Sequence, residues 1–220
     1  AAGSVVTEEQ MARLFGAAHD PVTDTVLGRE YVTTPPPADR VAAAVAALPP
    51  DLAGEERDAR IAAITATEKA KPHRSSVAGF DLTFSVPKSV SVLWALSDAG
   101  EQRAIVDAHH AAIAVTVGLI ERDVARTRTG HAGAARVPVR GLVAAAFDHH
   151  DSRAGDPQLH THLTVANRAQ AADGKWRTLD SQSLYAAAVA HSDTYDLLLA
   201  DNLTRALGLA WETRQRRRDR

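Results

Sequence analysis

The chain has 220 residues, no cysteine and a formal net charge of −2 at pH 7. Its length can bury a substantial core as one domain, or as one domain with extensions. The lack of cysteine excludes disulfides and thiolate zinc sites, and the small net charge excludes a strong overall field for nucleic acid. The alanine-rich run 41–48 is too short to span a bilayer, and no segment reads as a signal peptide.

The first 78 residues predict helices joined by irregular chain. Thr7 and Gln10 form a capping-box pattern at the start of a short helix. Glycine and proline residues scattered through 16–37 predict an irregular segment there. Two longer helices are expected over 38–48 and from about 54 to 70.

Residues 80–86 predict a half-buried strand, because large apolar and small polar side chains alternate along them. Asp81 and Thr83 share the polar face of this strand. A helix is expected to follow over 87–96. A second, longer helix is expected from 101 to about 126, where apolar residues recur at helical spacing.

The last third of the chain predicts strands, one tight turn and a final helix. The turn is indicated by Asp173-Gly174, and Gly208 is a typical helix terminator. The expected segments are a strand region over 137–148, a loop over 150–158, a strand over 159–168, a returning strand over 175–178, and a helix from 181 or 183 to 207. Strands interleaved with long helices, together with a hairpin, predict an α+β fold with a central, mainly antiparallel sheet flanked by helices.

Three histidines carry the main chemical signal. His160 and His162 stand two residues apart in a strand and therefore point to the same face, with Thr161 turned the other way. His149 ends the preceding strand and could supply a third imidazole, although His150 competes for that place. Three neutral nitrogens predict a divalent-metal site with open coordination positions. Because neutral ligands leave the metal its full charge, such a site suits an anionic phosphodiester.

Asp81 is the nearest candidate for an acidic partner of these histidines. It could accept a proton from a nucleophile, or it could fix the tautomer of a ligand histidine. The sequence leaves both roles open. Neither the glycine-rich phosphate-binding patterns nor the His-Glu-Xaa-Xaa-His hydrolase spacing occurs in the chain.

The same residues carry a family resemblance. Residues 79–91, 147–153 and 156–162 together resemble the relaxase domain of MobF-type conjugative relaxases. These belong to the HUH (His-hydrophobe-His) endonucleases, and here Thr161 fills the middle position of the motif. The resemblance runs from Gly79 onward, whereas residues 5–78 match only loosely. It implies a palm-like HUH fold, with residues 1–78 as an N-terminal helical and irregular part, 79–212 as the catalytic core and 213–220 as a basic tail.

By position, the resemblance implies that His149, His160 and His162 are the metal ligands. It makes Asp81 the carboxylate that helps to activate the nucleophile and orients a ligand histidine. The implied cofactor is a divalent metal ion, Mg or Mn, with Zn, Ni or Co as alternatives. Two positions, Lys88 and Arg153, are suited to DNA or phosphate contact. Single-strand recognition by basic and aromatic side chains adds candidates around the hairpin, namely Arg168, Lys175, Trp176 and Arg177.

The implied activity is nicking and transfer of single-stranded DNA at a plasmid transfer origin in the bacterial cytoplasm, without membrane insertion. In such enzymes a tyrosine attacks a phosphodiester, which leaves a 5′-phosphotyrosyl link and a free 3′-hydroxyl. Relaxosome accessory proteins and a coupling protein are further implied partners. Full-length relatives usually continue into a helicase domain.

The nucleophilic tyrosine is the point at which the chain departs from the family. The family's tyrosines precede the first short helix, and the tyrosines here are Tyr31, Tyr185 and Tyr195. The chain also starts without methionine and stops within a basic run. We therefore expect a fragment without its nucleophile. Two alternatives remain: an origin-binding module that does not cleave DNA, and a metal-dependent phosphodiester hydrolase that needs no tyrosine.

Overall fold

The computed structural model describes residues 3–31, 34–71 and 76–212. It divides into two compact units, of which unit 2 comprises residues 30–78 and unit 1 comprises the chain on either side. Unit 2 ends at residue 78, and residues 1–29 group with residues 79–220 in unit 1. The expected basic tail, 213–220, lies outside the described residues.

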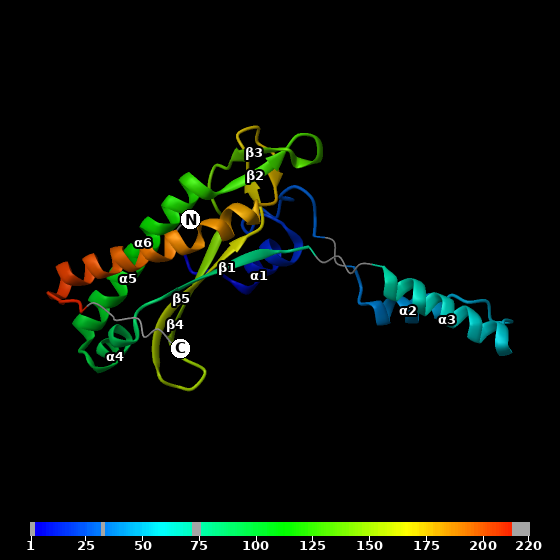
Figure 1. Ribbon diagram of the computed structural model, residues 1–220, viewed down its shortest axis with the longest axis horizontal. Coiled ribbons are helices and arrows are strands. Elements are labelled where there is room, and N and C mark those ends of the chain that lie inside the picture. Colours follow the sequence, from blue (N-terminus) through cyan, green and yellow to red (C-terminus); the bar gives the residue numbers. More distant parts are fainter. Residues whose placement is uncertain (1–2, 32–33, 72–75, 213–220) are drawn as a thin grey trace, which may run out of the picture. The chain divides into compact units, whose positions relative to one another are not determined.

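A three-stranded antiparallel sheet forms the centre of unit 1 (Figure 1). Its strands are β1 (Gly79–Ser85), β4 (Ala144–Asp151) and β5 (Pro157–Ala166), in the order β1-β5-β4. The histidine-bearing strand β5 is thus central, with both neighbours antiparallel to it. The pairing of β4 with β5 shifts register between His149 and Asp151. The expected α+β class with an antiparallel sheet is confirmed.

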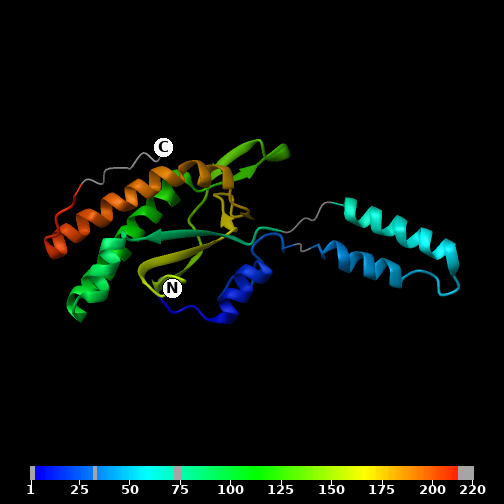
Figure 2. The same cartoon turned by 60° about the horizontal axis from the view of Figure 1, so that its bottom comes forward.

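Three helices cover one face of this sheet. They are α4 (Lys88–Leu96), α5 (Ala99–Leu119) and α6 (Ser181–Leu207). Helices α5 and α6 lie side by side (Figures 1 and 2). The core contains side chains of the sheet together with side chains of all three helices. Wholly or almost wholly buried members are Ile105, Leu159, Val165, Leu199 and Leu203, each of which contributes about 1.5–3 kcal/mol by its burial.

Among the described residues, one helix is long and apolar enough to cross a membrane, the segment Ala99–Val124 formed by α5 and the π-helical turn η2 (Ile120–Val124). Several of its apolar side chains are nevertheless buried within the protein. Ile105 and Ala112 are fully buried in the cluster that includes the sheet and α6. This burial is typical of a core helix.

Two small hairpins extend from the core. The first joins β2 (Arg126–Thr129) to β3 (Ala135–Pro138), with the 3₁₀ turn η3 (His131–Gly133) between them, and the second joins β6 (Ala169–Gln170) to β7 (Trp176–Arg177). The turn expected at Asp173-Gly174 is confirmed, with Gly174 at φ 78°.

The continuous strand expected over 137–148 is wrong. Strand β3 ends at Pro138 and β4 begins only at Ala144. Proline has no backbone N–H to continue a ladder. Beyond it Gly141 has a φ of 158°, and the Glu121 side chain accepts a hydrogen bond from the Leu142 N–H. The chain therefore leaves the strand conformation between Pro138 and Ala144.

The N-terminal segment packs on unit 1 through α1 (Glu8–Met11) and the π-helical segment η1 (Ala12–Ala17). The expected capping box is confirmed, because Thr7 accepts from the Gln10 N–H and the Gln10 side chain accepts from the Thr7 N–H. Leu14 and Leu27 form a second apolar cluster with Ala166 of β5. This contact ties the segment to the central strand.

Unit 2 is a helical hairpin of α2 (Pro37–Ala46) and α3 (Gly54–Ala70). The expected helix 54–70 is confirmed, and the first helix begins and ends within two residues of its expected bounds. Arg40 joins the two helices, since its Nε lies 3.0 Å from Glu68 Oε2. Its guanidinium also donates to the Glu68 carbonyl oxygen at 2.7 Å.

Candidate metal centre

The sheet brings His149, His160 and His162 together on the face opposite the helices. Alternation along β5 sends Leu159, Thr161 and Leu163 into the interior and the two histidines outward. His149 is the cross-strand partner of His160. The ring centroids are 5.1 Å apart in each of the three pairs, so the cluster expected from the sequence forms.

The donor atoms lie close enough together that they could hold a metal ion. One ring nitrogen from each histidine lies within 4.8 Å of the other two. Nitrogens that each lie about 2.1 Å from a shared ion are at most about 4.2 Å apart, so a small adjustment of the side chains suffices. The donor set of three imidazoles suits a divalent transition metal and leaves positions open for a substrate oxygen.

The hydrogen-bond partners of two histidines set their tautomers. Nδ1 of His160 lies 2.8 Å from the carbonyl oxygen of Gln158, and Nδ1 of His162 lies 2.7 Å from Asp81 Oδ2. Both partners accept hydrogen bonds, so each Nδ1 carries the proton. The lone pair of each Nε2 is therefore directed away from these partners and is available to a cation.

Asp81 stands on β1, and its carboxylate is half exposed on the same face. Besides His162, it is 3.4 Å from the hydroxyl of Thr83. Of the two roles left open by the sequence, this geometry favours orientation of a ligand histidine.

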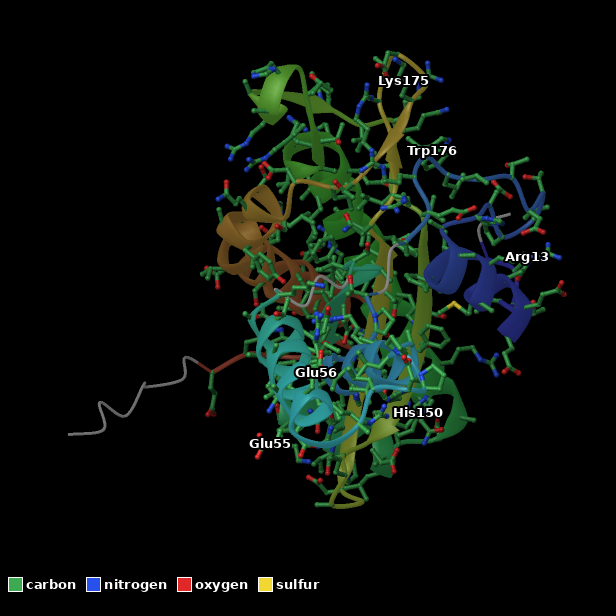
Figure 3. The ribbon with its side chains drawn as sticks, turned by 90° about the vertical axis from the view of Figure 1, so that its right-hand side faces the viewer. Arg13, Glu55, Glu56, His150, Lys175 and Trp176 are labelled. Atoms are coloured by element: carbon green, nitrogen blue, oxygen red, sulfur yellow. The ribbon has the colours of Figure 1, made fainter. Side chains whose placement is uncertain are left out.

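His150 is not a member of the cluster. Its ring stacks on that of Trp94 in α4, with centroids 4.9 Å apart and an interplanar angle of 20°. The position of His150 on β4 can be followed in Figure 3. The competition between His149 and His150 that the sequence left open is therefore resolved in favour of His149 in the structure.

Arg153 belongs to the β4–β5 turn, and Lys88 contacts the same turn. Lys88, in the first turn of α4, forms an ion pair with Asp156 and donates to the Pro157 carbonyl oxygen at 2.7 Å. Hydrogen bonds from Lys88 and Ser152 hold the pKa of Asp156 below its usual value. Arg153 is exposed within the turn.

The other basic candidates lie elsewhere. Lys175 and Trp176 belong to the β6–β7 hairpin, at the opposite end of unit 1 from His150 (Figure 3). Arg177 forms a two-pronged ion pair with Asp173, at 2.9 and 2.7 Å. Arg168 is 5% exposed, and its guanidinium donates to backbone carbonyl oxygens. That burial favours a structural role for Arg168.

The three tyrosines have other partners. Tyr195 is buried on α6, where its hydroxyl lies 2.7 Å from His109 Nδ1, and burial raises its pKa. Tyr185, also on α6, packs edge-on against Phe80 with ring centroids 6.3 Å apart. Tyr31 belongs to unit 2, where its hydroxyl donates to the Ala78 carbonyl oxygen at 2.8 Å. Both tyrosines of unit 1 are thus on the helix side of the sheet.

Sequence reasoning missed a polar cluster behind the histidines. It contains His109 and His110 of α5, Asp148 of β4, Thr161 of β5 and Tyr195 of α6. Burial would raise the pKa of Asp148, but hydrogen bonds from Thr161 and His110 lower it overall. The signal available in the sequence was a histidine, His109, on the apolar face of a core helix.

The TrwC relaxase family model matches residues 1–220, the whole chain. The chain belongs to the TrwC relaxase family. The resemblance to MobF-type relaxases is thereby confirmed, and it extends over the N-terminal residues that matched only loosely by motif.

Two kinds of relative place the chain within this family. The multifunctional conjugation protein TraI of Escherichia coli is 44% identical over 107 residues, which are 48% of this chain and 6% of TraI. The solved structure of TrwC complexed with a 27-mer DNA, comprising the recognition hairpin and the cleavage site, has a TM-score of 0.57 and 30% identity, covering 80% of this chain and 64% of that one.

A second solved structure is a metal-bound conjugative relaxase TrwC in complex with oriT DNA. Its TM-score is 0.54 at 36% identity, and the match covers 60% of this chain and 45% of that chain. This chain thus spans less than two thirds of each of these relatives of the TrwC relaxase family.

Proposed function

We propose that this chain is the metal- and DNA-binding part of a conjugative relaxase that nicks single-stranded DNA at a plasmid transfer origin and transfers the cut strand. The observation that carries the proposal is the convergence of three imidazoles, with ligand nitrogens within 4.8 Å of one another, in a member of the TrwC relaxase family. TrwC itself has been solved with origin DNA and with metal. We place the activity in the bacterial cytoplasm, with relaxosome accessory proteins and a coupling protein as partners.

The three histidines and Asp81 have different roles in the proposed metal site. His149, His160 and His162 hold the cation, which when bound stabilises the negative charge that develops on the oxygens of the scissile phosphate. Asp81 keeps the proton of His162 on Nδ1. The family resemblance makes Mg or Mn the expected ions in the cell, and the three imidazole ligands by their own chemistry suit the alternatives Zn, Ni or Co.

Basic side chains at the β4–β5 turn would bind the DNA backbone. Arg153 is exposed in the β4–β5 turn, and Lys88, whose side chain is half exposed, forms an ion pair with Asp156 of the same turn. Phosphate contacts of this kind make binding salt-dependent. Lys175 and Arg177, at the β6–β7 hairpin, would contact a more distant part of the DNA strand.

The attacking tyrosine, in this proposal, is none of the three in the chain. Tyr185 and Tyr195 lie on the helix side of the sheet, and the hydroxyl of Tyr31 is used in unit 2. In this step the tyrosine loses its hydroxyl proton and its oxygen bonds to phosphorus. The bond between phosphorus and the 3′-oxygen breaks, and the 3′-oxygen takes up a proton and leaves as a hydroxyl. This step needs a tyrosine supplied by additional sequence.

The experiment compares the 220-residue chain with a longer protein that includes the preceding sequence of its gene. Each is incubated with Mn²⁺ and origin single-stranded DNA, and covalent adducts are separated by denaturing gel electrophoresis. We expect binding without cleavage by the 220-residue chain, and a tyrosine-linked product from the longer one. If the 220-residue chain cuts and Tyr31→Phe abolishes cutting, the assignment of the nucleophile is wrong.

The positions of the tyrosines also favour a second candidate, an origin-binding module that never cleaves. In that case the longer protein binds DNA tightly and salt-dependently, with no adduct. Cleavage that leaves no protein–DNA link would instead indicate attack by water, as in a metal-dependent hydrolase.

A further inference from the structure

A directed chain of hydrogen bonds lies on the helix side of the sheet, directly behind the histidine cluster. The Tyr195 hydroxyl is 2.7 Å from His109 Nδ1, and His109 Nε2 is 2.8 Å from Thr161 Oγ1. The Thr161 hydroxyl lies 2.6 Å from Asp148 Oδ1, and Asp148 Oδ2 lies 2.9 Å from His110 Nε2. These hydrogen bonds together link α6, α5, β5 and β4.

The direction of each hydrogen bond in this series, from donor to acceptor, can be assigned in only one consistent way. The Asp148 carboxylate accepts, so the Thr161 hydroxyl donates to it and accepts from the Nε2–H of His109. Nδ1 of His109 is then unprotonated and accepts from the Tyr195 hydroxyl. Burial lowers the pKa of His109 to about 4, which agrees with a neutral ring that donates through one nitrogen and accepts through the other.

Two of these residues are cross-strand partners beside the ligands. Asp148 pairs with Thr161, and the next pair along the strands is His149 with His160. Since successive side chains alternate between faces, an Asp148 held on the helix side places His149 on the metal side. A slip of one residue would exchange the faces. That exchange would bring His150 into the place of His149.

The backbone ladder gives little protection against such a slip. Among the described strands, β4 pairs only with β5 and so lies at an edge of the sheet. The register shifts immediately after His149, before the Asp151–Pro157 pair. Alternate pairings are most accessible where a strand is held on one side and a bulge is near.

We propose that Tyr195, His109, Thr161 and Asp148 form a positioning device that locks β4 against β5 in the register that makes His149, and not His150, the third metal ligand. The proposal rests on the metal site proposed above. None of the four residues is assigned a contact with the cation or the DNA. They act through the strand that carries His149.

The test uses the 220-residue chain and Ni²⁺, which stands high in the affinity order of divalent metals and stays measurable when a ligand is weakened. Thr161→Val keeps the shape of the side chain and removes the hydroxyl. We expect Ni²⁺ binding by calorimetry to weaken about tenfold, at the lower end of the effect of residues that orient metal ligands. Thr161→Ser restores the hydroxyl and should bind Ni²⁺ within about twofold of the parent.

Thr116→Val is the matched control. Thr116 is also fully buried, on α5, and its hydroxyl donates to the Ala112 carbonyl oxygen within the helix. We expect Thr116→Val to lower the unfolding temperature without changing Ni²⁺ affinity.

Tyr195→Phe is a milder change to the positioning device, because the ring keeps its packing on Phe84. It should weaken Ni²⁺ binding about threefold even if Thr161→Val fails to fold.

A double-mutant cycle tests whether the device acts through His149. In a His149→Ala background, Thr161→Val should cost no further Ni²⁺ affinity. An equal loss of Ni²⁺ affinity in both backgrounds would overturn the proposed positioning device. His160→Ala distinguishes failure of the metal site from failure of the positioning device. If His160→Ala leaves Ni²⁺ binding unchanged, the metal site itself is wrong. If His160→Ala abolishes binding while Thr161→Val behaves like Thr116→Val, the metal site stands and the positioning device does not.

Discussion

The Nδ1 atom of His162 on β5 lies 2.7 Å from Oδ2 of Asp81 on the neighbouring strand β1. The two residues are not direct cross-strand partners, since His162 pairs with Thr83 and Asp81 with Thr164. Their contact is therefore a diagonal one across the open face of the sheet. It connects the edge strand β1 to the proposed metal site and fixes which nitrogen of His162 is free.

The first prediction concerns this contact. Asp81→Ala should weaken Mn²⁺ or Ni²⁺ binding by about 10- to 100-fold, because the free His162 ring loses its orientation and basicity. Asp81→Asn keeps an acceptor for the Nδ1–H, and its effect should be smaller. Calorimetric titration measures both. Asp123→Asn, an exposed residue paired with Arg122, serves as the control, and equal effects at positions 81 and 123 would contradict the assignment.

The second prediction is that metal stabilises the folded chain. A ligand that binds only the folded state adds about 2.7 kcal/mol at 100 times its dissociation constant, so the unfolding temperature should rise with Ni²⁺. His160→Ala should remove this rise. His131→Ala changes an exposed histidine of η3 and should retain it. A rise that survives His160→Ala would place the metal elsewhere.

The third prediction concerns pH. Burial lowers the pKa of His109 from 6.5 to about 4, so between these values the unfolded chain binds a proton that the folded chain does not. The stability contribution is fully present above pH 6.5 and is lost as the pH falls toward 4. His109→Gln should therefore flatten the decline in unfolding free energy from pH 7 to 4 by up to about 3 kcal/mol.

Urea unfolding at pH 7, 5.5 and 4.5 measures this slope, and His131→Gln provides an exposed control. A decline of the same steepness in the parent and in His109→Gln would mean that His109 is not the group responsible.

The fourth prediction concerns DNA. Arg153→Ala should weaken single-stranded DNA binding and reduce the magnitude of the salt slope by about 0.7, the value for one lost phosphate contact. Arg122→Ala removes the same charge from an exposed residue that is paired with Asp123 and should leave the slope unchanged. Fluorescence anisotropy at several salt concentrations gives both slopes. An unchanged slope for Arg153→Ala would remove this residue from the interface.

Much of the local structure followed from the sequence because its causes are local. The capping box at Thr7, the α3 helix over 54–70 and the termination of α6 at Gly208 each depend on residues a few positions apart. The shared face of His160 and His162 follows in the same way from the two-residue period of a strand. The missed break after Pro138 shows the limit, since the contact that turns the chain there joins Leu142 to Glu121.

What the sequence by itself determined was therefore most of the helices and strands, the family, and two of the three imidazoles on one face. Only the tertiary structure showed the ring of His149 beside the other two histidines and that of His150 on Trp94, the contact of Asp81 with His162, and the burial of Arg168. The physical reason is that alternation within one strand depends on adjacent residues. The register between strands and the partner of each polar group depend on segments far apart in the chain.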